Sequence, residues 1–500
     1  MADEKLHTQL SHRLFATSRS EMRINMKSIS RYLEEDKEKW ANLPYLSVKK
    51  QDSYVTHTFS EVVTDVQALA RALLREGVSG NIMIYAGNSY EWMIADLAIL
   101  AYVGVCIPVD REWTAFDLCH ILSVLTVNTI LYEKDKKDVI LTVQKTYPQI
   151  RFLCIEDCFP AFLNTGSILS KPLHGNGDRN QTAMILFTSG TTSRPKAIPL
   201  TQTNLLHNAA GLFSRTPMTT DDISYLCLPL HHIYAGVAHF LYTIISGMQI
   251  YLGSGTDHIL TELLAVRPSV FCAVPLILNR IYENASETVW EMLRNIRYLY
   301  CGGSFLDPQI KQAFLRHGVT LLEAYGMTET ASVVALADPE DDNTDCNGKI
   351  LDGVDVRIIH ADADGVGEII VGGANVSSGY LYSNGTYREF DSDGFYHTGD
   401  LGTIDNSRHL YLKGRKKRLI LTSNGKNIYI DELEQLIAEH PLIQSAVVFE
   451  EQFHPAARIY TSLSESDTRK YIDEINSRLP RYKQIQTIYR LPEKKEGRIK

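Results

Sequence analysis

A stretch rich in hydroxyls, glycine and cations lies between residues 184 and 199 of this 500-residue chain, and it reads MILFTSGTTSRPKAIP. The apolar run from Met184 to Phe187 predicts a buried strand that ends at Thr188. The loop that follows offers backbone N–H groups, hydroxyls and the cations Arg194 and Lys196, a set that suits a polyanion. The order Gly-x4-Gly-Lys-Ser/Thr of the common phosphate loop is absent. We therefore predict a triphosphate-binding loop of another type, with a polar surface turn as the ordinary alternative.

Four further stretches carry groups that suit a nucleotide. Tyr325 to Thr330 (YGMTET) follows a predicted strand, so its side chains are expected at the carboxyl edge of a sheet, where ligands of open α/β sheets bind. The turn from Cys301 to Ser304 (CGGS) could let the backbone approach a flat ligand closely. Tyr396 to Leu401 (YHTGDL) supplies the carboxylate of Asp400. Lys413 to Arg418 (KGRKKR) is cationic and precedes the turn Ser423-Asn424-Gly425, although most short basic runs are solvated turns.

The elements that must position these groups alternate between strand and helix from Thr58 onward. A helix is predicted to start near Thr58, with Ser60 as its cap, and another to start at Thr201. Short apolar strands are predicted at 81–85, 105–109, 129–132, 151–155, 224–230, 269–274, 298–300 and 320–322. This alternation indicates open, mostly parallel α/β sheets.

The length of the chain exceeds the usual size of one hydrophobic core, so more than one domain is expected. Beyond about residue 340, short strands such as 354–359 and 368–371 alternate with Gly/Asp turns and indicate a small β subdomain. The basic stretch at 413–418 precedes a new apolar strand at 419–421. We predict a large N-terminal domain over 1–413 and a small C-terminal α+β domain over 414–500, with the first fifty residues as a peripheral helical lead-in.

Composition excludes several classes of protein. A formal net charge of -9 gives no support to nucleic-acid binding, and the charged start of the chain is not a secretory signal. The longest apolar stretches are interrupted by Asp96 and His239, which favours buried elements over transmembrane segments. The eight cysteines form no Cys-x-x-Cys pair, a pattern typical of reduced thiols in a cytoplasmic protein.

Taken together and in this order, TSGTTSRPK, YGMTET, YHTGDL and GRKKR with its following Asn-Gly turn resemble the adenylate-forming superfamily of acyl-CoA synthetases, luciferases and peptide-synthetase adenylation domains. The resemblance covers the chain from about Thr58 to its C-terminus. It implies that a carboxylate attacks the α-phosphate of ATP to give an acyl-adenylate and pyrophosphate, and that a thiol then displaces AMP. ATP, Mg²⁺ and coenzyme A are the implied cofactors.

The resemblance also assigns roles to residues. The β- and γ-phosphates are assigned to the loop residues Thr188, Ser189, Gly190, Thr191, Thr192, Ser193 and Lys196. Thr328 would bind the α-phosphate and Glu329 would ligate Mg²⁺, a cation that prefers oxygen. The catalytic set implied by the family is Lys196, His232, Thr328, Glu329, Arg498 and Lys500.

Adenine and ribose are assigned to residues in the second half of the chain. Tyr325 would stack on adenine, with Gly302 and Gly303 as one wall. Glu323 and Gly326 belong to the same nucleotide site, and Asp400 would accept both ribose hydroxyls with help from Arg415.

The acyl pocket and the hinge complete the assignment. His232, Tyr234 and Gly326 would border the acyl group, while the alternative for His232 is a core histidine beside His231. The resemblance implies that the domain over 1–413 binds ATP and the acyl group and that the domain over 414–500 is mobile. The family's C-terminal domain rotates between the two steps about the residue two after the GR arginine, here Lys417.

The chain departs from the family pattern near its C-terminus. Arg498 stands where the family has the lysine that bridges the substrate carboxylate and the phosphate, and an arginine fork does not replace a compact ammonium group. Either Arg498 serves, or Lys494, Lys495 or Lys500 reaches the site, or adenylation is slow. Glu323-Ala324 also replaces a Gln-Gly pair common in many members.

Three functions are compatible with these residues. An acid–thiol ligase acting on a small-molecule fatty or aromatic acid with CoA as acceptor is favoured, because no Asp lies near Tyr234 to hold a substrate amine. The second function is loading of a phosphopantetheinyl acyl carrier protein. The third is a nucleotide- or acyl-binding protein with impaired catalysis.

Overall fold

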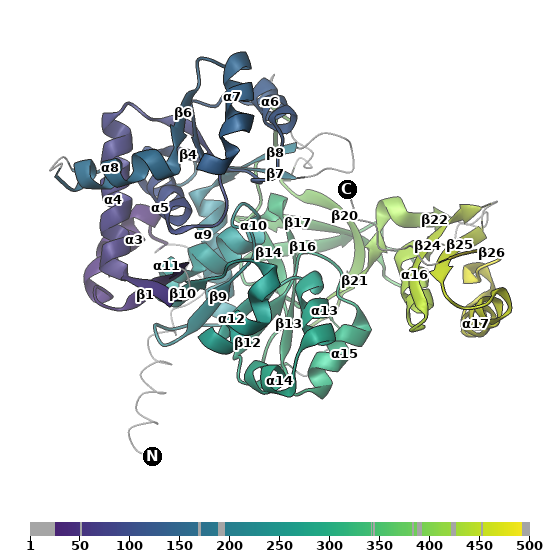
Figure 1. The fold of residues 1–500 in the computed structure, drawn as a ribbon. Helices are drawn as coiled ribbons and strands as arrows, with labels where there is room; N and C mark the ends of the chain where they lie inside the picture. Colours follow the sequence, from purple (N-terminus) through teal and green to yellow (C-terminus); the bar gives the residue numbers. More distant parts are fainter. Residues whose placement is uncertain are drawn as a thin grey trace. The chain divides into compact units, whose positions relative to one another are not determined.

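The computed structural model describes residues 26–50, 53–168, 172–188, 196–341, 343, 346–382, 385–387, 393–421, 427–451 and 454–492. Within this part of the chain, the elements gather into two compact units, one formed by 1–259 with 377–387 and the other by 260–376 with 388–500. Figure 1 shows the fold, with labels on many of the helices and strands of both units.

The first unit contains an eight-stranded sheet with the order β19-β18-β8-β7-β4-β3-β5-β6. Strands β4, β3, β5 and β6 pair in parallel, whereas β7 and β8 pair antiparallel. The strands are β3 Gly80–Tyr85, β4 Gly104–Pro108, β5 Thr129–Tyr132, β6 Arg151–Cys154, β7 Thr182–Thr188, β8 Lys196–Thr201, β18 Tyr380–Tyr382 and β19 Gly385–Tyr387. Apolar side chains of β3, β4 and β5 pack with those of α6 and α7 in a common core that includes Met83, Ile107, Leu118, Ile130 and Ile140.

The same unit holds the strand run β9-β10-β1-β2, in which β9, β10 and β1 are parallel and β2 is antiparallel to β1. These strands are β1 Pro44–Lys50, β2 Ser53–Thr58, β9 Ile223–Leu226 and β10 Gln249–Leu252. The helices of the unit are α3 Ile29–Lys39, α4 Phe59–Arg75, α5 Tyr90–Ala98, α6 Ala115–Val124, α7 Lys137–Thr146, α8 Ile155–Ile168, α9 Gln202–Arg215, α10 Ile233–Ala235 and α11 Tyr242–Ser246. Two π-helical turns, Ile99–Val103 and Gly236–Leu241, and two 3-10 turns, Lys134–Lys136 and Thr256–His258, complete it.

The second unit contains the strand run β15-β14-β13-β12-β11, parallel from β11 to β13 and antiparallel beyond. The strands are β11 Val270–Ala273, β12 Tyr298–Cys301, β13 Leu321–Met327, β14 Ser332–Leu336 and β15 Lys349–Ile350. The helices along this part of the chain are α12 Ile259–Val266, α13 Pro275–Asn284, α14 Glu287–Arg294 and α15 Pro308–Arg316, and the 3-10 turn η5 spans Thr328–Thr330.

A four-stranded antiparallel sheet, β16-β17-β20-β21, follows in the same unit and is the predicted β subdomain. Its strands are β16 Val354–Ile359, β17 Gly367–Gly373, β20 Tyr396–Ile404 and β21 Leu410–Arg415. The predicted strand over 354–359 matches β16.

The last part of the chain has an apolar core of its own, formed around Ile428, Leu433, Ile459, Ile472 and Ile485. Its elements are η6 Lys416–Arg418, β22 Leu419–Leu421, β23 Asn427–Tyr429, α16 Ile430–Ala438, β24 Ile443–Glu451, β25 His454–Thr461, α17 Glu465–Arg478, η7 Arg481–Lys483 and β26 Thr487–Leu491. The predicted α/β class with a β subdomain and a C-terminal α+β region is confirmed. The boundary between 413 and 414, the limits of the two predicted domains and the mobility of the second stay predictions.

Several local predictions differ from the structure. The cap of α4 is Thr58 and not Ser60, because the Thr58 hydroxyl accepts a bond from the Glu61 N–H at 3.2 Å while Glu61 Oε2 accepts one from the Thr58 N–H at 2.7 Å. The first fifty residues include strand β1 as well as helix α3. The strand predicted over 224–230 ends at Leu226, and the one predicted over 320–322 runs on to Met327. Among the described residues, no helix is both long and apolar enough to cross a membrane.

Candidate functional site

The segment YGMTET joins the end of β13 to the start of β14 in the second unit. Tyr325, Gly326 and Met327 are the last residues of β13, and Thr328 to Thr330 form the 3-10 turn η5. A Cβ added to Gly326 would lie 1.7 Å from the Ser332 carbonyl oxygen, so only glycine fits this close strand approach. Thr328 and Glu329 are therefore presented on a tight turn at the carboxyl end of a sheet strand, as predicted.

The backbone after this turn adopts a conformation that side chains rarely accept. Ala331 has φ 54° and Ser332 has φ 110°, both in the left-handed region. Each such residue costs about 1–3 kcal/mol unless the surrounding structure holds it. Strain of this kind clusters at functional sites, which fits the location beside Thr328 and Glu329.

A group formed by the buried residues Tyr325 and Asp400 and the exposed Arg415 is the centre of the candidate site. The Tyr325 hydroxyl donates to Asp400 Oδ2 at 2.8 Å. Arg415 Nε lies 3.0 Å from Asp400 Oδ1, because Asp400 on β20 and Arg415 on β21 are cross-strand partners. Three motifs separated in sequence thus converge on one carboxylate, which we call the Asp400 cluster.

The electrostatics of the Asp400 cluster follow from its burial. Asp400 is 8% exposed and Tyr325 is 9% exposed, whereas the Arg415 side chain is 65% exposed. Burial raises the pKa of Asp400 above its usual value, and the Arg415 guanidinium and the Tyr325 hydroxyl oppose that rise. Burial and then the Asp400 carboxylate hold the pKa of Tyr325 well above its usual value, so this hydroxyl keeps its proton and remains a donor.

Gly302 and Gly303 follow β12, the parallel neighbour of β13, so they lie at the same sheet edge as Tyr325. Gly303 has φ +87°, and the Gly302 N–H donates to the Ala273 carbonyl at 3.3 Å. The left-handed turn at Gly303 requires glycine, which agrees with the predicted close approach of backbone to a flat ligand.

Glu323, the departure from the family pattern, is engaged by other residues of the second unit. Lys311 forms an ion pair with Glu323 Oε1, and Asn347 Nδ2 donates to Glu323 Oε2 at 3.4 Å. Neither partner carried a sequence signal, because each is far from Glu323 along the chain. The assignment of Glu323 to the nucleotide stays a prediction.

Glu329 is the residue that fits the implied Mg²⁺. Glu329 is 8% exposed and lies on the η5 turn. No group of three or more His, Cys, Asp or Glu side chains gathers for a metal in the described part of the chain. Mg²⁺ is commonly held by one or two carboxylates together with substrate phosphates and water, so one carboxylate beside the predicted α-phosphate residue Thr328 suits it.

In the first unit, the predicted phosphate loop connects β7 to β8. Thr188 ends β7 and is the cross-strand partner of Lys196, which begins β8, and the predicted strand over 184–187 lies inside β7. Lys196 Nζ lies 4.4 Å from the centroid of the buried Tyr380 ring, a cation–π contact. The loop residues Ser189, Gly190, Thr191, Thr192 and Ser193 lie outside the described residues.

His232 and Tyr234 lie where β9 leads into the short helix α10. His232 is the residue before α10, and its ring centroid lies 4.2 Å from that of His231. His231 Nε2 in turn lies 3.9 Å from Asp110 Oδ2. Burial lowers the pKa of His231 to about 4 and lowers that of His232, so both rings are neutral at pH 7.

The backbone that leads to these histidines is held by Asn88. Its Nδ2 donates to the Leu228 carbonyl at 2.8 Å, and its Oδ1 accepts from the Leu230 N–H at 2.9 Å. No sequence pattern connects Asn88 with the segment before His231 and His232, since about 140 residues separate Asn88 from its two partners. Asn88 therefore positions a segment whose role had been predicted only from its own motif.

The structure describes the predicted hinge residue Lys417 but not Arg498, the residue in place of the family's C-terminal lysine. Lys417 lies in η6, between the end of β21 and β22. Arg498 and Lys500 lie outside the described residues, as do Lys494 and Lys495. The roles of these residues stay predictions.

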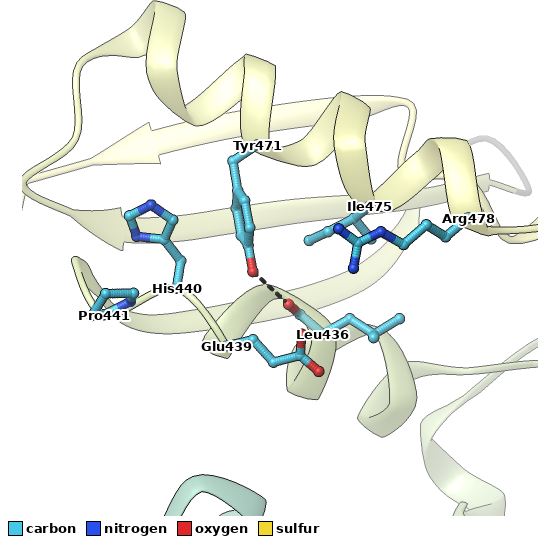
Figure 2. A pocket seen from close by; sticks show the side chains of 7 residues that line it. All are labelled: Leu436, Glu439, His440, Pro441, Tyr471, Ile475 and Arg478. Carbon is cyan, nitrogen blue, oxygen red and sulfur yellow. Dashed lines mark hydrogen bonds between the residues drawn. The ribbon is translucent and has the colours of Figure 1, made fainter.

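A pocket lies between α16 and α17 in the C-terminal region (Figure 2). Its polar groups are engaged locally: the Tyr471 hydroxyl donates to the Leu436 carbonyl at 2.9 Å, and His440 Nδ1 accepts from the Leu442 N–H at 3.1 Å. The sequence analysis placed no functional residue here. We therefore do not assign the nucleotide or the acid to this pocket.

The α/β fold and the convergence of Tyr325 and Arg415 on the buried Asp400 carboxylate fit an enzyme of the adenylate-forming class. Residues 33–381 match the family model described as AMP-binding enzyme. The chain belongs to the AMP-binding enzyme family, and it is an enzyme.

Curated relatives and solved structures agree with this assignment. A long-chain-fatty-acid–CoA ligase of Mycobacterium bovis is 28% identical over 453 residues, which cover 78% of this chain and 74% of that protein. A 2-succinylbenzoate–CoA ligase of Staphylococcus epidermidis is 32% identical over 53% of this chain and 56% of its own length. The ATP-bound structure of MatB from Rhodopseudomonas palustris superimposes with a TM-score of 0.81 at 23% identity, covering 93% of this chain and 94% of that one, and so supports the fold.

Proposed function

We propose that this enzyme is an ATP-dependent acid–thiol ligase, which activates a carboxylic acid as an acyl-adenylate and transfers the acyl group to CoA. The observation that carries the proposal is the Asp400 cluster, in which Tyr325 and Arg415 meet one buried carboxylate. The relatives that match the chain are named as acid–CoA ligases, which supports the same reaction.

In this proposal the nucleotide is held by the Asp400 cluster, the Gly302–Gly303 turn and the η5 turn. The Asp400 carboxylate, anchored by the Tyr325 hydroxyl and Arg415, has further lone pairs for the ribose hydroxyls. The Tyr325 ring and the Gly302–Gly303 turn border adenine. Thr328 donates to the α-phosphate, where negative charge gathers as the acid carboxylate attacks. Glu329 holds Mg²⁺, which, when bound, neutralises phosphate charge.

The acid is proposed to be fatty or aromatic. Tyr234 and the neutral ring of His232 offer an apolar border, because burial lowers the pKa of His232 and keeps the imidazole uncharged. No carboxylate stands near Tyr234 in the sequence to hold an amine. The relatives are named for a long-chain fatty acid and for 2-succinylbenzoate, one aliphatic acid and one aromatic acid, which supports this substrate class.

ATP–pyrophosphate exchange across a panel of carboxylic acids tests the first half-reaction. We expect exchange with at least one fatty or aryl acid and none with free amino acids. Loss of the free CoA thiol, compared with loading of a holo-carrier protein, then tests the acceptor. Exchange without any consumption of CoA would contradict the CoA-ligase proposal and favour the carrier protein.

Arg498 motivates the alternative of an impaired nucleotide- or acyl-binding protein. If Arg498 does the bridging, Arg498→Ala abolishes exchange. Exchange that survives this substitution excludes Arg498 from the role and leaves Lys494, Lys495 or Lys500. Exchange that is absent from the native chain but gained in Arg498→Lys would favour the impaired form.

Lys417 is proposed as the hinge between the two half-reactions. Lys417→Pro fixes φ at this position, so we expect thioester formation to fall more than adenylation. Single-turnover measurement of each half-reaction checks this expectation, and an equal loss in both would contradict the hinge.

A further inference from the structure

We propose that Thr330 and Asn375 are positioning residues that hold Thr328 and Glu329 in place relative to Asp400. This inference rests on the proposed function of the Asp400 cluster and of the η5 turn. Neither Thr330 nor Asn375 stands out in the sequence as a ligand-binding group. Both are fully buried, at 0% exposure.

Thr330 closes the turn that carries Thr328 and Glu329. Its hydroxyl accepts from the Met327 N–H at 3.3 Å and is placed to donate to the Met327 carbonyl at 3.1 Å. The Ser332 carbonyl, at 3.4 Å, is a weaker alternative acceptor for the same proton. The Thr330 side chain therefore ties the end of β13 to the end of η5 across the two residues that would meet the phosphates and Mg²⁺.

The turn needs such a tie because of its backbone. Ala331 and Ser332 are both in the left-handed region, which side chains other than glycine rarely adopt. Ser332 pairs with Met327 and is the first residue of β14, so the chain enters the strand at the second of these two residues. Without the Thr330 bonds, the relaxed alternatives of residues 331 and 332 would move Thr328 and Glu329.

Asn375 connects this turn to the sheet that carries Asp400. It lies two residues beyond β17, and β17 pairs with β20, the strand of Asp400. Asn375 Nδ2 donates to the Thr330 carbonyl at 3.2 Å. Together with the bond from Tyr325 to Asp400, this bond links the β13–β14 hairpin directly to the β17–β20 sheet at two different residues of the hairpin.

The burial of Asn375 indicates that it is not there for stability alone. Its Oδ1 is buried and has no hydrogen-bond partner in the part of the chain that the structure describes. A buried acceptor without a partner is unfavourable, so an amide is a costly residue for this position unless its donor is needed. The bond that uses the donor is the one to Thr330.

The experiment compares Thr330→Val and Asn375→Ala with matched controls in the C-terminal core. Thr461→Val removes a buried hydroxyl that donates to the Leu442 carbonyl at 2.6 Å, and Asn476→Ala removes an amide that bonds both backbone groups of Ile485 at 2.8 and 2.9 Å. Thr330→Ser keeps the hydroxyl and serves as the conservative rescue. Each protein is assayed for its thermal midpoint, for kcat and KM in ATP–pyrophosphate exchange, and for MgATP affinity by calorimetry without acid.

We expect Thr330→Val and Asn375→Ala to lower kcat of exchange by roughly 10- to 100-fold and to weaken MgATP binding, with KM for the acid unchanged, since a displacement of about 1 Å at reacting groups costs up to about 100-fold. Thr330→Ser should restore most of the activity. The two controls should lower the thermal midpoint while kcat and KM of the folded enzyme stay unchanged.

The proposal is overturned if Thr330→Val and Asn375→Ala lose thermal stability alone, as the controls do. It is also overturned if MgATP affinity is the same in the native chain and both variants. A native chain that binds MgATP but exchanges with no acid contradicts the proposed ligase function only, because the calorimetric comparison still tests the two positioning residues. A native chain that binds no ATP overturns both.

Discussion

The two groups of predicted functional residues are built in different ways. In the second unit, the residues of the Asp400 cluster bond to one another: Tyr325 and Arg415 share the two oxygens of one buried carboxylate. In the first unit, the predicted residues are held by groups outside the predicted set. The Lys196 ammonium group lies over the Tyr380 ring. The backbone before His231 and His232 is held by two hydrogen bonds to the Asn88 side chain.

This difference predicts how substitutions should combine. Residues that share one buried hydrogen-bonded network show large interaction energies, about 0.5–3 kcal/mol, whereas independent sites add. The Asp400 cluster should therefore respond to substitutions as a unit. The residues of the first unit should respond one at a time, through the neighbours that hold each of them.

The largest effect is expected from Gly326→Ala. Its Cβ would lie 1.7 Å from the Ser332 carbonyl oxygen, so β13 and β14 must separate where Thr328 and Glu329 are presented. We expect loss of ATP–pyrophosphate exchange together with a lower thermal midpoint. Gly166→Ala is the matched control in the first unit, because its Cβ would lie 1.8 Å from the Ala68 carbonyl oxygen. The control should lose stability and yet keep its KM for ATP.

The next effect concerns the Asp400 cluster itself. Asp400→Asn removes the negative charge that accepts the Tyr325 hydrogen bond and pairs with Arg415. Hydrogen bonds to charged groups contribute about 1.5–3 kcal/mol, so kcat/KM for ATP should fall by roughly 10- to 100-fold. Tyr325→Phe should lower it in the native background and add little in the Asp400→Asn background. Steady-state kinetics of the double-mutant cycle measure the coupling. Additive losses would show that the three residues do not act as a unit.

The sequence predicted the parts of the fold that depend on local pattern. The alternating run over 354–359 became β16 with the same limits, and Thr201 caps α9 through its bond from the Asn204 N–H at 3.0 Å. The cap of α4 was predicted at Ser60 and lies at Thr58, although the Thr-x-x-Glu spacing is a capping-box pattern that indicates Thr58. Strand β1 was not predicted, because its lysines and its position beside a charged helix obscured the short apolar run of Tyr45 and Leu46.

The candidate site was predictable only as a set of motifs. YGMTET and YHTGDL pointed to the same ligand, but the bond between Tyr325 and Asp400 joins residues 75 apart and is set by the packing of two sheets. For the same reason the partners Lys311, Asn375 and Tyr380 carried no signal. A side chain that acts on another through tertiary contact has no spacing rule to reveal it.

A smaller effect is expected in the first unit from Tyr380→Leu. The ring lies 4.4 Å from Lys196 Nζ, and such a contact contributes about 0.5–1 kcal/mol, so KM for ATP should rise by roughly two- to fivefold. Tyr380→Phe keeps the ring face and should stay near the native value. If Tyr380→Leu leaves KM for ATP unchanged, the ring does not position Lys196.

The smallest expected effect is on the pH dependence of stability, and it compares a charged histidine in the second unit with a neutral one in the first. In the second unit, His409 lies between Asp405, 2.7 Å from Nδ1, and Asp341, 2.6 Å from Nε2. Partial burial opposes the charge, but the two carboxylates raise the pKa of His409 above its usual value. In the first unit, burial lowers the pKa of His239 to about 3, so this ring stays neutral.

Opposite signs follow for stability. The contribution of His409 is fully present below the pKa of about 6.5 that an unfolded histidine has, and it is lost as pH rises through the raised folded value. The contribution of neutral His239 is present above about pH 6.5 and is lost as pH falls toward its folded value, because the unfolded chain then binds the extra proton. Thermal midpoints between pH 5 and 9 should therefore show that His409→Asn costs more at pH 6 than at pH 8, and that His239→Asn costs more at pH 8 than at pH 6. The same pH trend in both variants would mean that the two histidines do not differ in charge, and the contrast between the units would fail at this point.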